Sequence, residues 1–195
     1  MVRKFTDKEL LARAEALPTF KGFPESLWII GVRSTADLPD EFDDKFYIYE
    51  GKTFVMMGTG TTHPAASILR GGFQSYNPLG AAIVKSDMWH HDIWKYGKHK
   101  GKMDALVQVG APITIYRDGD KDLKSEETGK EMSGYYGINF HANTYDMENT
   151  TIKQKILGWS AGCQVVNDTP KYVEMMKLFS GQKSKKVSYC LLKEF

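Results

Sequence analysis

The sequence predicts a mainly β protein with short helices, a β-rich member of the α+β class. Short runs of β-branched and aromatic residues recur along the chain, turn residues separate them, and few segments show helical spacing. The chain has 195 residues, of which 42% are hydrophobic and 26% charged. This length and composition are sufficient for one domain with a substantial buried core.

Two helices are expected, one near each end of the chain. Thr6 and Glu9 have the spacing of a capping box, and apolar residues then follow on one face until Pro18. Near the other end, Thr169 and Pro170 form an N-cap and first-turn pair, and Gly181 closes the segment.

The remaining regular structure is expected to be strands. The predicted strands are 27–32, 46–49, 53–57, 80–84, 106–109, 113–116 and 187–192. Residues 50–52 are short enough to join two of them as a hairpin. The lysine- and aromatic-rich segment 94–102 is interpreted as a solvated loop. We expect residues 1–45 to form a helix and a strand that pack onto a domain at 46–195.

Composition excludes several classes of protein. Lysine and arginine number 26 and aspartate and glutamate 24, and a net charge of +2 gives no indication of nucleic-acid binding. No run approaches the roughly 20 apolar residues of a membrane span. Two cysteines are too few for a disulfide framework or a four-cysteine metal site.

A cysteine and a histidine form the strongest candidate for chemistry. Gly162 precedes Cys163, where the backbone can turn sharply and N–H groups can stabilise an oxyanion. A thiol needs a nearby base to become a nucleophile at neutral pH, and His141 on a short strand-like segment is a suitable partner. Asn139, Asn143 or a backbone carbonyl could orient the imidazole.

Each of these residues also has a structural interpretation. A lone cysteine is usually a small buried hydrophobic residue, and this is the expected role of Cys190 on its alternating strand. A zinc peptidase is a further alternative, but no His-Glu-x-x-His or comparable spacing is present. The residues considered for that metal site are His63, His90, His91, Asp92 and His99.

The order of several blocks resembles the L,D-transpeptidase catalytic domain family of the YkuD type. His141 is followed after 18 intervening residues by Ser160-x-Gly162-Cys163. The version Trp-Ser-Ala-Gly-Cys-Gln-Val is similar to a divergent branch among phage and bacterial cell-wall peptidases. The other matching blocks lie, in order, at 60–62, 99–101, 105–108, 116–118 and 137–141.

The resemblance implies an L,D-transpeptidase-like β-sandwich and a cysteine enzyme acting on peptidoglycan stem peptides, with no cofactor and no metal. It implies that Cys163 is the nucleophile, that His141 is the base and that a thioester forms. The other residues assigned to the turn, the oxyanion site or substrate binding are Gly162, Ser160, Asn139, Asn143, His99, Trp159 and Gln164.

Two departures from the family pattern bear on the reaction. Ala161 replaces the histidine of the usual Ser-His-Gly-Cys block, and Gln164-Val165 stands where an arginine often follows the cysteine. Both missing groups help to hold substrate in better-known members, so we expect hydrolysis of the acyl-enzyme at least as much as transfer to an amine.

The expected place of action is the cell wall, outside the cytoplasm. Residues 1–7 show no apolar leader, which favours a phage-encoded lysis enzyme or virion component. The alternative from another class is a non-catalytic wall-binding or virion structural protein that retains the fold.

Overall fold

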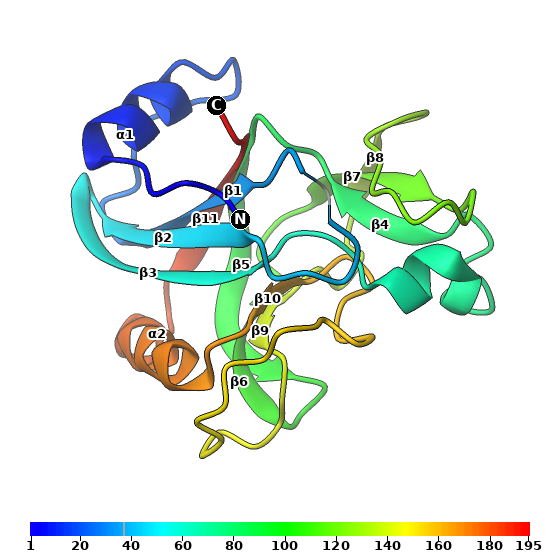
Figure 1. Ribbon diagram of the computed structural model, residues 1–195. Helices are drawn as coiled ribbons and strands as arrows, with labels where there is room; N and C mark the ends of the chain where they lie inside the picture. Colours follow the sequence, from blue (N-terminus) through cyan, green and yellow to red (C-terminus); the bar gives the residue numbers. More distant parts are fainter. Residues whose placement is uncertain (37) are drawn as a thin grey trace.

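The computed structural model describes residues 1–36 and 38–195, and its largest sheet closes into a barrel (Figure 1). The order around the barrel is β1-β11-β5-β6-β9-β10-β3-β2. These strands are β1 (Leu27–Arg33), β2 (Asp44–Glu50), β3 (Thr53–Thr61), β5 (Met88–His99), β6 (Met103–Gln108), β9 (Phe140–Ala142), β10 (Gln164–Val166) and β11 (Lys186–Lys193). The predicted β-rich α+β class is confirmed. The expected sandwich of two stacked sheets is not formed. The largest sheet is instead a closed barrel, because every strand in it is hydrogen-bonded to a neighbour on both sides.

A second, three-stranded sheet lies beside the barrel. It has the order β4-β7-β8, formed by β4 (Ala81–Val84), β7 (Ile113–Asp118) and β8 (Met132–Gly134). A short helical turn at Ile68–Gly72 precedes it in the chain. Figure 1 shows this sheet and the N-terminal helix on different sides of the barrel.

The N-terminal helix α1 (Asp7–Glu15) begins with the predicted capping box. The Thr6 N–H donates to Glu9 Oε2 at 2.8 Å, and the Glu9 N–H donates to Thr6 Oγ1 at 3.3 Å. The helix buries Leu10 and Ala14 in a cluster with Trp28 on the outer face of β1. Because the inner face of β1 joins the barrel core as well, the strand is apolar along nearly its whole length.

Residues 1–45 contribute directly to the barrel. Strand β1 pairs in parallel with β11 and antiparallel with β2. The domain boundary expected at residue 45 falls within β2, which begins at Asp44.

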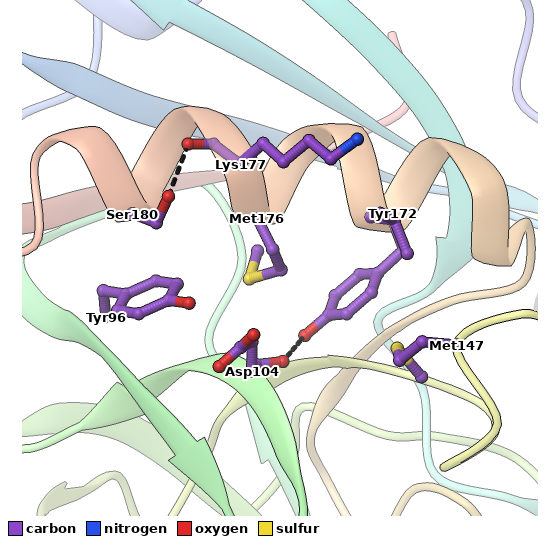
Figure 2. Close-up of a pocket in the computed structure, with 8 residues that line it drawn as sticks. Tyr96, Asp104, Met147, Tyr172, Met176, Lys177 and Ser180 are labelled. Carbon is purple, nitrogen blue, oxygen red and sulfur yellow. Dashed lines mark hydrogen bonds between the residues drawn. The ribbon is translucent and has the colours of Figure 1, made fainter.

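The second helix, α2 (Thr169–Gly181), packs against the barrel core. Its N-cap is Asp168 and not Thr169, because the Asp168 carboxylate accepts the Lys171 N–H at 3.1 Å. Figure 2 shows the Tyr172 hydroxyl donating to the backbone carbonyl of Asp104. Both residues line a pocket of about 260 Å³. Within the described ranges, no helix is both long enough and apolar enough to cross a membrane.

The interpretation of residues 94–102 as a loop is wrong, because most of them belong to the 12-residue strand β5 and its hairpin with β6. A bulge breaks the alternation of the strand. Asp92 has a φ of +57°, and the pairing register with β11 shifts beside it. Trp89 therefore packs under α1, whereas Ile93 and Trp94 both join the barrel core.

Candidate active site

Strands β9 and β10 place His141 and Cys163 on the same face of the sheet. They run parallel, with His141 opposite Val165. Side chains alternate along a strand, so Cys163, just before β10, projects to the same side as Val165 and His141. Gln164 and Phe140 project to the other side, into the barrel. The sequence alone gave no means of establishing this shared face.

The turn that carries the thiol is braced by Ser160. The Ser160 hydroxyl donates to the Cys163 carbonyl at 2.8 Å and accepts the Gly162 N–H at 3.1 Å. The Gly162 N–H is therefore already bonded and is not available to an oxyanion. The N–H of Cys163 itself makes no hydrogen bond within the described residues and remains the available donor in this turn.

Glycine is required at position 162 for two reasons. Its φ is +134°, a conformation that other residues rarely adopt. A Cβ there would lie 2.5 Å from the Ala82 carbonyl oxygen and 2.8 Å from the Ala82 Cβ. The turn thus packs directly on β4, and the Ala82 N–H donates to the Ala161 carbonyl at 3.1 Å.

The thiol of Cys163 is partly exposed in a polar backbone environment. The Asn139 N–H donates to its sulfur at 3.5 Å, and the thiol lies 3.5 Å from the Gly137 carbonyl. Burial raises the pKa of the thiol, while the Asn139 N–H and the Lys100 ammonium act in the lowering direction. The net shift is upward, so the resting cysteine is a neutral thiol at pH 7.

The imidazole of His141 is a neutral base. Its Nδ1 lies 2.7 Å from the Ala142 carbonyl, which makes Nδ1–H the donor and leaves the Nε2 lone pair free. Nε2 has no hydrogen-bond partner within the described residues. Burial lowers the pKa of His141 to about 3, and the neighbouring His99 acts in the same direction.

Asn139 orients His99 and not His141. Asn139 Oδ1 accepts the Gln108 N–H at 2.9 Å, so its Nδ2 donates to His99 Nδ1 at 3.0 Å. The His99 ring stacks on His141 with centroids 4.1 Å apart. Burial lowers the pKa of His99 to about 4, so the second ring is also neutral and supports the first by packing.

The other predicted site residues lie in different places. Trp159 lines the cavity at Cys163 and contacts Tyr145 with ring centroids 5.1 Å apart. Asn143 is buried and does not line this cavity. Gln164 lies inside the barrel, where it donates to the Gly162 carbonyl and accepts the Tyr189 hydroxyl, so it supports the turn and does not reach substrate.

A cavity of about 400 Å³ joins these groups. It takes the predicted residues Cys163, His141, His99 and Trp159 together with residues that the sequence analysis did not assign to the site. The latter are Phe73, Tyr76, Asn77, Ala82, Lys100, Arg117, Tyr136, Gly137, Ile138, Gly158 and Ala161. Several belong to blocks of the stated resemblance, and this was the available signal for them. Of residues 1–36 and 38–45, none lines the cavity.

Two of the histidines considered for a zinc site bond different backbone carbonyls. His90 Nε2 meets the Lys85 carbonyl at 2.9 Å, and His91 Nε2 meets the Thr19 carbonyl at 2.8 Å. Across residues 1–36 and 38–195, no three His, Cys, Asp or Glu side chains are grouped to hold a metal ion.

The geometry supplies a thiol, a neutral imidazole and one free backbone donor around a cavity. These are the parts needed for acyl transfer through a cysteine nucleophile. In comparisons with known proteins, no protein-family model, no curated protein and no solved structure matches the chain.

Proposed function

We propose that this protein is a cysteine-dependent peptidase or L,D-transpeptidase that acts on peptidoglycan stem peptides through a thioester. The observation that carries the proposal is the placement of Cys163 and His141. They come from separate segments, project from one face of neighbouring parallel strands and line the same cavity. The L,D-transpeptidase-like blocks of the sequence supply the substrate class and a place of action in the cell wall.

The reaction begins from a neutral pair. His141 Nε2 accepts the proton of the Cys163 thiol as the sulfur attacks the amide carbonyl carbon of the substrate. The carbonyl oxygen gains the negative charge, and the free N–H of Cys163 stabilises it. Because both groups are uncharged at rest, the proton moves during attack and no thiolate is stored beforehand.

The second half of the reaction releases the amine. The imidazolium of His141 returns its proton to the leaving nitrogen as the carbon–nitrogen bond breaks, which leaves a thioester on Cys163. Water then attacks the thioester to give a carboxylic acid, or an amine attacks to give a new amide. Either step restores the thiol.

Mass spectrometry of stem peptides tests the proposal. Wild type is expected to remove a terminal residue from purified stem peptides and to carry a covalent adduct equal to the peptide minus its leaving amine. Cys163→Ala should show neither change, and His141→Gln should slow adduct formation by at least about 100-fold. Cys190→Ala is the matched control, because that thiol is buried in β11, away from the cavity.

The incoming nucleophile and the alternative function are resolved in the same experiment. Incorporation of ¹⁸O from labelled water identifies a peptidase, and incorporation of an added amine identifies a transpeptidase. If wild type changes no stem peptide while wild type and Cys163→Ala bind cell wall equally, the protein is a non-catalytic wall-binding protein and the enzyme proposal fails.

A further inference from the structure

The cavity at Cys163 is positively charged. Among the described residues, its lining includes two basic side chains, Lys100 and Arg117, and no aspartate or glutamate. The two lining histidines are neutral at pH 7 because burial lowers the pKa of His99 to about 4 and that of His141 to about 3. A cleft lined by one sign of charge attracts ligands of the opposite sign.

The position of Arg117 relative to the thiol is defined by the small sheet. Arg117 lies on β7 directly opposite Ala82 of β4. The Ala82 N–H in turn holds the Ala161 carbonyl at 3.1 Å, in the turn that ends at Cys163. Two backbone pairings therefore connect the arginine to the turn that carries the nucleophile.

The hydrogen-bonding capacity of Arg117 is largely unused. One guanidinium nitrogen donates to the Gly80 carbonyl at 3.1 Å, and the group lies 5.2 Å from the centre of the Tyr136 ring. Its Nε is buried without a partner, and no carboxylate of the described residues forms an ion pair with it. A half-buried cation in this condition is incompletely compensated.

Arg33 shows how the same protein compensates an arginine that has a structural role. Its guanidinium bonds the Thr62 hydroxyl and carbonyl, the Val84 carbonyl and the carboxylate of Glu127, which lies 2.7 Å away. Arg117 has no such carboxylate. This contrast with Arg33 indicates that the negative partner of Arg117 belongs to a ligand.

We propose that Arg117 binds a free carboxylate of the substrate, with Lys100 at the cavity wall adding to the attraction. The substrate class, taken from the proposed function, is then a peptide that carries a free carboxylate near the amide that Cys163 attacks. A planar guanidinium can hold a carboxylate through two parallel hydrogen bonds, which fixes the orientation of the peptide as well as its affinity. This arginine comes from β7 and not from the segment that follows the cysteine.

Binding to an inactive variant tests the carboxylate directly. Calorimetry of Cys163→Ala with a stem peptide, and with the same peptide after its carboxyl groups are converted to carboxamides, should show at least about tenfold tighter binding of the acid. In the Cys163→Ala background, the further substitution Arg117→Gln should abolish that preference, whereas Arg117→Lys should retain part of it. Arg70→Gln is the control, because Arg70 is exposed and does not line the cavity.

A second measurement needs no stem peptide. The Cys163 thiol is reacted with two methanethiosulfonates, one bearing an anionic sulfonatoethyl group and one a cationic trimethylammonioethyl group. The anionic-to-cationic rate ratio should fall at least about tenfold in Arg117→Gln and stay unchanged in Arg70→Gln. Circular dichroism spectra and melting curves establish that each variant is folded.

The outcomes separate this proposal from the proposed function. If folded Arg117→Gln keeps both the acid preference and the reagent rate ratio of wild type, the carboxylate site is refuted. If wild type processes no stem peptide but the rate ratio depends on Arg117, the enzyme proposal fails and the anion site stands. If the peptide is processed and its carboxamide form binds equally well, the enzyme proposal stands and Arg117 has another role.

Discussion

Replacement of Gly162 by alanine is the sharpest test of how the turn positions the thiol. The substitution forces a non-glycine residue to a φ of +134°, which costs about 1–3 kcal/mol. The new Cβ would also lie 2.5 Å from the Ala82 carbonyl oxygen, and such overpacking costs about 1–3 kcal/mol. We therefore expect the free energy of unfolding to fall by about 2–6 kcal/mol.

The same clash predicts a larger effect on the rate of stem-peptide processing than on the rate at which a small reagent alkylates Cys163. To reach an ordinary contact distance of about 3.4 Å, the turn must move by nearly 1 Å away from β4. A displacement of about 1 Å in a catalytic group is worth about 100-fold in rate. Gly162→Ala should therefore process stem peptides about 100-fold more slowly, while alkylation of Cys163 by iodoacetamide changes by less than about tenfold.

Gly101→Ala is the matched control for this experiment. Gly101 also has a positive φ, +70°, but a Cβ there meets no atom within 4 Å. The free energy of unfolding of Gly101→Ala should fall only by the cost of a non-glycine residue at positive φ, about 1–2 kcal/mol. Urea unfolding of both variants gives the comparison. Equal losses of stability in the two variants would refute the argument that the contact with Ala82 positions the turn.

Three further predictions follow from the same contacts. The ¹⁵N signals of the His141 ring should not titrate between pH 8 and pH 5, because its pKa is about 3; a midpoint near 6.5 would contradict the neutral base. Ser160→Ala should lower the free energy of unfolding, measured by urea titration, by about 1–3 kcal/mol, since it removes two hydrogen bonds of a buried side chain; an unchanged midpoint would exclude its bracing role. Glu127→Ala should cost about 3–5 kcal/mol because Arg33 is left buried without its counter-ion, whereas Glu131→Ala, at an exposed ion pair, should cost no more than about 1 kcal/mol. Equal losses in those two variants would contradict the assignment of a buried pair.

Local signals in the sequence were enough to predict most of the regular structure. The capping box at Thr6 and Glu9 acts over one helical turn, and the start of α1 is confirmed. The hairpin between β2 and β3 follows from turn residues between two apolar runs, and it is also confirmed. The strand β5 was missed because its bulge at Asp92 interrupts the alternation by which strands are recognised.

In the candidate site, too, the sequence was enough to identify some residues and not others. Cys163 and His141 could be selected from the sequence because their side chains carry the chemistry themselves. The place of Gln164 could not be predicted: it lies one position from the cysteine, and only the barrel determines which face of β10 points inward.

The sequence by itself determined the fold class, most of the elements and the two residues proposed for catalysis. The tertiary structure alone decided the closure of the barrel, the stacking of His99 on His141 and the position of Arg117 in the cavity wall. The physical reason is the range of the interactions. Capping, turns and alternation act between residues a few positions apart, whereas strand order and cavity walls come from pairings between segments distant in the chain.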